Sequence, residues 1–123
     1  MKRKFGAMFA VLALLLAGCP SEKNFRDGIA AFHGFLIQAQ DHHETECRAA
    51  PTKTLCVSIN KAGDALNIAR AALKVYCSGT PKAGDQPFLQ GGPCVVDKSA
   101  EPRMQAAFSE LQKLLPVIKD LGK

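Results

Sequence analysis

The sequence lacks the short motifs by which common enzymes are recognised. It contains no Gly-x-Ser-x-Gly, no glycine-rich phosphate loop, no His-Glu-x-x-His and no Cys-x-x-Cys-His for haem attachment. It has no tryptophan, and its single tyrosine, Tyr76, falls on an apolar helical stripe. Asp64 and Glu110, which could otherwise form an acid–base pair, fall on solvent-facing helical positions. We therefore expect no catalytic residues, no cofactor and no enzymatic activity.

Long apolar runs and dense charge are also missing. The apolar run from Phe5 to Gly18 has 14 residues, whereas a helix needs about 20 to span a bilayer. The formal net charge is +5, but three of the positive charges precede the apolar run and belong to the start of the chain: Lys2, Arg3 and Lys4. No dense basic face follows them, so we expect no nucleic-acid binding.

The start of the chain has the order of a secretory signal. A basic beginning is followed by the apolar run and then by the small residues Ala17 and Gly18. The stretch Leu16-Ala17-Gly18-Cys19 resembles the lipobox of bacterial lipoprotein signal peptides. This resemblance implies that residues 1–18 are cleaved, that the Cys19 sulfur receives a diacylglycerol, and that the new α-amine is acylated, so that labelled palmitate is incorporated.

The same resemblance indicates where the protein is held. Two or three acyl chains anchor a protein stably, whereas one chain binds only marginally. Pro20 follows the cysteine, in place of the aspartate that resembles an inner-membrane retention signal in enteric bacteria. We therefore expect a protein anchored through Cys19 to the outer membrane and facing the periplasm. Removal of 18 residues from 123 leaves 105, with 13 Lys and Arg against 11 Asp and Glu, which fits one small domain over 19–123.

Three segments of that domain repeat apolar residues at alternating steps of three and four, which places each set on one helix face. We predict helices over 22–48, 54–77 and 100–121. Thr52 or Thr54 is expected to cap the second and Ser99 the third. The predicted core stripes are Phe25, Ile29, Phe32, Leu36, Ala39, His43 and Cys47, then Leu55, Ile59, Ala62, Leu66, Ala69, Leu73 and Tyr76, then Met104, Phe108, Leu111, Leu115 and Ile118, with Leu121 as a possible last member. Strand signals are lacking, and similar helix lengths favour an all-α, up-down-up three-helix bundle.

Four cysteines remain after Cys19, and an even number in an exported chain indicates two disulfides. Cys56 and Cys77 lie about 31 Å apart if they share one helix, far beyond the roughly 7 Å that a bridge allows between Cα atoms. That bond is therefore excluded, together with the Cys47–Cys94 bond that would accompany it. A Cys47–Cys77 bond would join opposite ends of the bundle. The remaining connectivity, Cys47–Cys56 with Cys77–Cys94, is predicted to close both ends.

The loop from Ser78 to Lys98 contains three prolines and four glycines, which rule out a regular element. Loops of this length are often functional. Its apolar pair, Phe88 and Leu89, has two interpretations. The pair either covers the open end of the core, which we favour, or is presented as a contact for a partner.

A second polar cluster lies near the end of the first predicted helix. His42 and Glu46 share a helix face at positions i and i+4 and could supply two metal ligands. No matching ligands occur elsewhere in the sequence. We therefore predict a solvated helix end and no metal site.

These features leave two classes of function open. The first, which we favour, is a membrane-anchored, non-enzymatic binding or structural module of the cell envelope. It would contact an envelope protein through a helix face or through the Cys77–Cys94 loop. The second is an inhibitory or exclusion factor that acts on an envelope enzyme, a phage or the conjugation machinery. A carrier of a small apolar ligand between the helices is a lesser third option.

Overall fold

The computed structural model describes residues 22–123 of the chain. The predicted signal peptide (1–18), the lipobox and Cys19 lie outside the described residues. Within them the protein is all-α, as predicted, with one isolated bridge between Ser78 and Val95. Its helices are α2 (Glu22–His42), α3 (Glu44–Ala49), α4 (Thr54–Tyr76) and α5 (Glu101–Leu121), with 3₁₀ turns η1 (Phe88–Gln90) and η2 (Lys98–Ala100).

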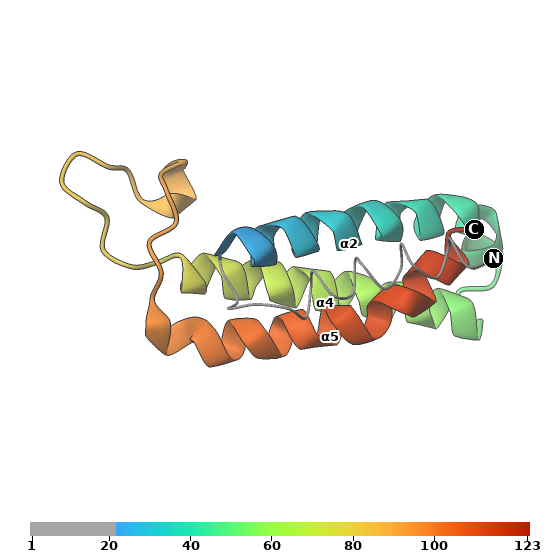
Figure 1. The fold of residues 1–123 in the computed structure, drawn as a ribbon. Coiled ribbons are helices and arrows are strands. Elements are labelled where there is room, and N and C mark those ends of the chain that lie inside the picture. Colours follow the sequence, from blue (N-terminus) through green and yellow to red (C-terminus); the bar gives the residue numbers. More distant parts are fainter. Residues whose placement is uncertain (1–21) are drawn as a thin grey trace, which may run out of the picture.

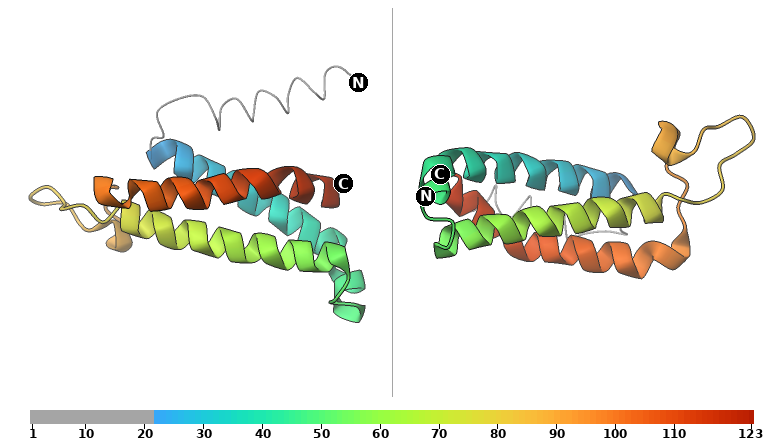
Figure 2. Two further views of the ribbon diagram at one scale, coloured as in Figure 1. Left: turned by 90° about the horizontal axis from the view of Figure 1, so that it is seen from below. Right: turned by 180° about the vertical axis from the view of Figure 1, so that it is seen from behind.

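The three long helices, α2, α4 and α5, lie side by side, and each packs against the other two (Figure 1 and Figure 2). The short helix α3 and the turn after it lead from α2 to α4 at one end. A long loop leads from α4 to α5 at the other end, where α2 begins (Figure 1). The C-terminus lies at the α3 end. One end of the molecule therefore has α3 and the C-terminus, and the other has the long loop and the start of α2.

Most residues of the predicted apolar stripes form the buried core, whereas five are only half-buried: His43, Cys47, Leu55, Leu73 and Leu121. Each long helix contributes fully buried side chains, including Phe25 from α2, Ala69 from α4 and Met104 from α5. The Phe25 ring meets Tyr76 and Phe108 edge to face, with centroids 5.3 and 5.2 Å apart, a favourable arrangement for aromatic pairs. One aromatic cluster therefore joins all three helices near the loop end.

The first predicted helix is interrupted, contrary to the expectation of a continuous helix over 22–48. α2 ends at His42, and His43, with φ −113° and ψ 13°, separates it from α3. The His43 ring contacts the last turn of α5, because its Nε2 atom lies 2.8 Å from the Leu121 carbonyl oxygen. This long-range contact accompanies a departure from helical geometry that the local apolar pattern did not indicate.

The predicted caps are also wrong. α4 begins after Lys53, which makes no side-chain capping bond, and Thr54 is already the first helical residue. Ser99 does not cap α5. Its backbone N–H and its hydroxyl both donate to the Asp97 carboxylate, at 3.0 and 2.6 Å. Asp97 therefore caps the 3₁₀ turn η2, which leads directly into α5.

The structure joins Cys47 to Cys56 and Cys77 to Cys94, with Cα atoms 5.5 and 4.6 Å apart. These are the pairs that the helix lengths predict. The first bridge links α3 to the first turn of α4, and the second links the end of α4 to the long loop. Each connection between long helices is thus closed by one covalent bond.

Candidate functional site

The Cys77–Cys94 loop is the most distinctive surface feature of the described chain. Its two arms meet at the base, where Gly79 N–H donates to the Val95 carbonyl at 2.8 Å and Asp97 N–H donates to the Tyr76 carbonyl at 2.8 Å. A side chain at Gly79 would place Cβ 2.6 Å from the Val95 oxygen, so this close approach requires glycine. Backbone hydrogen bonds and a disulfide together fix the base of the loop.

The returning part of the loop forms a compact turn around η1, near the start of α2 (Figure 1). Gln90 and Gly92 both donate their N–H groups to the Pro87 carbonyl, at 2.9 and 3.0 Å. Gly92 lies directly against the Gln86 carbonyl, and a Cβ there would overlap it. The chain therefore holds Phe88 and Leu89 in a defined position rather than in an extended segment.

The predicted contact pair divides into two roles. Phe88 is half-buried and packs against the core cluster, with the Arg26 guanidinium 6.0 Å from its ring centroid. Leu89 is 72% exposed, the most exposed large apolar side chain among the described residues. Phe88 therefore covers the end of the core, but the exposed Leu89 does not, contrary to the favoured interpretation that the pair covers it together.

The base of the loop holds the one group of three potential metal-ligating residues among residues 22–123. A Glu22 carboxylate oxygen and the sulfurs of Cys77 and Cys94 lie within 4.8 Å of one another. The two sulfurs are bonded to each other, so they are not available as thiolate ligands. Glu22 is also engaged with Arg26, 2.7 Å away. The arrangement is a disulfide beside an ion pair.

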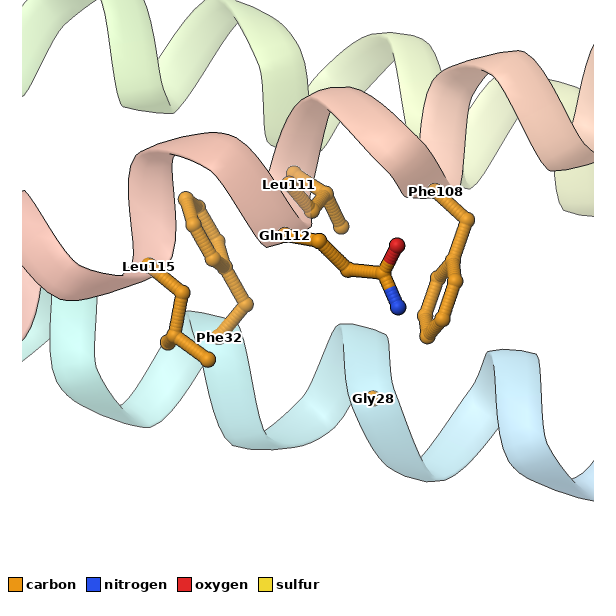
Figure 3. Close-up of a pocket in the computed structure, with 6 residues that line it drawn as sticks. All are labelled: Gly28, Phe32, Phe108, Leu111, Gln112 and Leu115. Atoms are coloured by element: carbon orange, nitrogen blue, oxygen red, sulfur yellow. The ribbon is translucent and has the colours of Figure 1, made fainter. Parts of the chain in front are cut away.

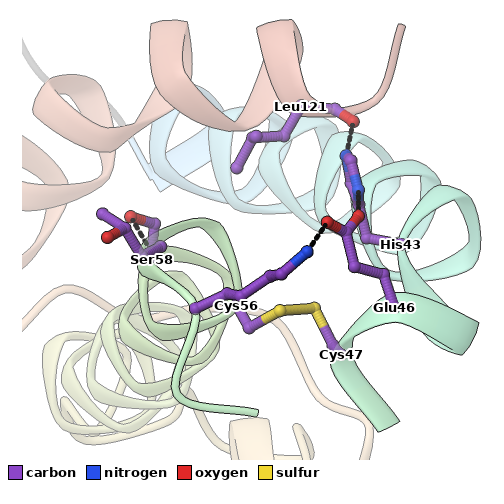
Figure 4. Close-up of a disulfide and its surroundings, with 8 residues drawn as sticks. His43, Glu46, Cys47, Cys56, Ser58 and Leu121 are labelled. Carbon is purple, nitrogen blue, oxygen red and sulfur yellow. Dashed lines mark hydrogen bonds and ion pairs between the residues drawn. A yellow bond between two sulfur atoms is a disulfide. The ribbon is translucent and has the colours of Figure 1, made fainter. Parts of the chain in front are cut away.

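The opposite end carries a polar chain beside the Cys47–Cys56 disulfide (Figure 4). Glu46 lies 3.1 Å from His43 Nδ1 and accepts a hydrogen bond from Lys53 at 2.8 Å. The Lys53 bond first, and the His43 bond second, hold the pKa of the Glu46 carboxyl below its usual value of 4.5. Glu46 thus pairs with His43 and Lys53 rather than with His42, the pairing considered from the sequence. His42 lies exposed, its ring 4.8 Å from that of His43.

Tyr76 is the sole tyrosine and belongs to the core rather than to a reactive surface. Burial raises the pKa of its hydroxyl above 10.0, and the negative charges of Glu101 and Glu22 raise it further. A phenol that resists ionisation next to Phe25 is a packing residue.

Hollows also lie between the helices of the described part of the chain. The crevice between α2 and α5 in Figure 3 has a volume of about 10 Å³ and is bordered by Gly28, Phe32 and Gln112 among others. That is room for about one water molecule. A second, open hollow of about 270 Å³ lies between α4 and α5, below the 300–1,000 Å³ that small-molecule pockets commonly offer. The first hollow is too small and the second too open to enclose an apolar ligand, so neither supports the carrier interpretation.

No protein-family model, no curated protein and no solved structure matches this chain. None of the helices within residues 22–123 is long and apolar enough to cross a membrane.

Two contacts that define these sites were not predicted from the sequence. The Arg26 guanidinium lies over Phe88, 62 positions later, and His43 reaches Leu121, 78 positions later. Phe88 was singled out from the sequence as a possible partner contact or core cover, but not as a neighbour of Arg26. Charged and aromatic residues of common types carry no local pattern that would identify such distant partners.

Proposed function

We propose that this protein is a lipid-anchored, non-enzymatic binding module of the cell envelope, with an up-down-up three-helix bundle as its body. The observation that carries the proposal is the lipobox-like stretch ending at Cys19, three positions before Glu22, where α2 begins. Three extended residues reach about 10 Å. Acyl chains on Cys19 would therefore hold the Glu22 end of the bundle close to the bilayer, and Pro20 favours the outer membrane.

The proposed contact surface is the Cys77–Cys94 loop. Glu22 lies beside this disulfide, so the loop is at the same end of the molecule as the proposed anchor. Leu89 projects from the loop with 72% of its surface exposed. Full burial of a leucine side chain is favourable by about 1.5–3 kcal/mol, and a pre-ordered loop loses little entropy on binding. An envelope protein next to the bilayer is the proposed partner.

The anchor is tested by growth with labelled palmitate and by fractionation of a Cys19→Ser variant. We expect the parent chain to incorporate the label and to sediment with membranes, and the variant to do neither. Ser21→Ala, two positions away, is the matched control and should behave like the parent. Unlabelled parent protein, or a Cys19→Ser variant that still fractionates with membranes, would contradict the lipid anchor.

The contact surface is tested by a photo-crosslinking amino acid placed at position 89 of the full chain in cells. We expect one defined heterologous adduct whose yield falls when Cys77 and Cys94 are both replaced by alanine. Position 82, exposed on the same loop, is the control and should give less of this adduct. Equal yields at both positions would show that Leu89 is not a specific contact.

A further inference from the structure

Helix α4 carries a second stripe on its outer side, distinct from the buried one. Val57 and Ile68 are 50% and 60% exposed, and they lie 11 positions apart. Residues with this spacing return to within about 20° of the same direction on a helix of 3.6 residues per turn. Lys61 and Asp64, both exposed, fall on the same line between them. We call these four residues the α4 stripe.

Three residues of the α4 stripe, Lys61, Asp64 and Ile68, line the open hollow of about 270 Å³ between α4 and α5. The hollow exists because small side chains, Ala65 and Ala107, line it on the two helices. Ile68 and Leu114 add apolar surface, so the region can accommodate the side chains of another helix. In the part of the chain that the structure describes, neither Lys61 nor Asp64 forms an ion pair.

The charge pattern of the stripe is complementary to its own reverse. Its members follow one another at steps of four, three and four, as apolar, Lys, Asp, apolar. Reversing the order exchanges Val57 with Ile68 and Lys61 with Asp64. An antiparallel copy therefore presents an apolar residue to each apolar residue and an opposite charge to each charge.

We propose that the α4 stripe pairs with the same stripe of a second copy of this chain, around a two-fold axis midway between Lys61 and Asp64. Val57 of each copy then packs against Ile68 of the other, and Lys61 of each pairs with Asp64 of the other. A two-fold interface requires this kind of self-complementary patch. A parallel arrangement would oppose Lys61 to Lys61 and Asp64 to Asp64, which is unfavourable.

The nearby charges are compatible with this arrangement. Glu110, which also lines the hollow, is held by Lys113 at 3.3 Å on the same helix. Lys61 is thereby left to the second copy's Asp64. The contact is a narrow seam of two helices, so we expect a dimer that is sensitive to single charge changes rather than an obligate one.

The first test places the photo-crosslinking residue at position 68 of the full chain in cells. We expect an adduct of twice the mass that contains only this chain. Ile37, a similarly exposed isoleucine at 41% on α2, is the control position and should give little of it. No adduct at position 68, or an adduct with a different protein only, would overturn the proposal.

The second test exploits the charge pattern. Lys61→Asp and Asp64→Lys each oppose like charges twice in the proposed dimer, so each should lower the yield of the position-68 dimer by about threefold to tenfold. The double exchange, Lys61→Asp with Asp64→Lys, restores both pairs and should restore the yield. All these positions are exposed, so circular dichroism should show the same helix content in every variant. A double exchange no better than the single changes would contradict the antiparallel pairing.

Discussion

The Nε2 atom of His43 lies 2.8 Å from the carbonyl oxygen of Leu121, which joins the end of α2 to the last turn of α5 (Figure 4). The Nδ1 atom of the same ring lies 3.1 Å from the Glu46 carboxylate. Both neighbours are hydrogen-bond acceptors. The imidazolium form can donate to both of them, whereas each neutral tautomer can donate to only one.

Replacing His43 by alanine should lower the free energy of unfolding by about 1–2 kcal/mol, because the half-buried ring loses its polar contacts with Leu121 and Glu46. His42→Ala, at the exposed neighbouring position, should change it by less than about 0.5 kcal/mol. Urea unfolding followed by circular dichroism measures both. Equal losses in the two variants would show that the Leu121 contact does not stabilise the fold.

The lowered pKa of Glu46 predicts a loss of stability in acid. Because the pKa is lower in the folded than in the unfolded state, the ionised carboxylate stabilises the protein above pH 4.5, and this contribution disappears as the pH falls through the folded-state pKa. The difference between the urea midpoints of the parent and of Glu46→Gln should therefore shrink as the pH falls from about 6 to about 3. Glu44→Gln, which loses an exposed pair with Arg48, is the control. A midpoint difference independent of pH would contradict the assignment.

Tyr76 predicts a loss of stability in alkali, and because it is the single tyrosine its ionisation can be measured directly. The Tyr76 pKa is raised above 10.0, so the neutral phenol stabilises the fold below pH 10, and this contribution is lost as the pH rises through the folded-state pKa. Ultraviolet titration of the native protein should show ionisation above pH 10, and titration in urea should return it to about 10. Glu101→Gln should lower the native value slightly. An unshifted native titration would mean that the ring is accessible to water.

The two disulfides should contribute unequally to stability. They close segments with sequence separations of 9 and 17, for which loop-closure entropy gives about 2.5 and about 3 kcal/mol. Replacing both Cys77 and Cys94 by alanine should therefore destabilise slightly more than replacing Cys47 and Cys56. It should also make the loop the first site of limited proteolysis. Thermal unfolding and mass mapping of the fragments test both effects, and a loop that stays resistant would show that its backbone hydrogen bonds suffice.

Phe88 and Leu89 should separate stability from binding. Phe88→Ser removes an aromatic side chain that covers the core and should cost about 1–2 kcal/mol of unfolding free energy. Leu89→Ser should change it by less than about 0.5 kcal/mol, while removing the proposed contact with an envelope partner. Chemical unfolding measures the stability of both variants, and co-purification of the partner identified through the position-89 adduct measures their binding. A Leu89→Ser variant that is strongly destabilised would place this side chain in the core.

The helices and the core followed from local pattern. Apolar residues such as Ile29, Leu66 and Leu111 recur at helical spacing. Burial of one apolar stripe per helix removes this surface from water, which is the dominant favourable contribution to folding. The helix lengths then constrained the cysteines, because a rise of 1.5 Å per residue keeps Cys56 and Cys77 too far apart to bond. The lipobox-like stretch at Cys19 is equally local, and it remains a prediction.

The tertiary structure decided what depends on distant neighbours. The break at His43 accompanies a contact with Leu121, and the cap at Asp97 replaces the one expected from Ser99. Phe88 is half-buried and Leu89 exposed because of where α2 and the core cluster lie beneath the loop. A sequence determines which faces of its helices are apolar, since that is a matter of spacing. Which polar group meets which depends on how those faces are finally packed together, and that is fixed only in three dimensions.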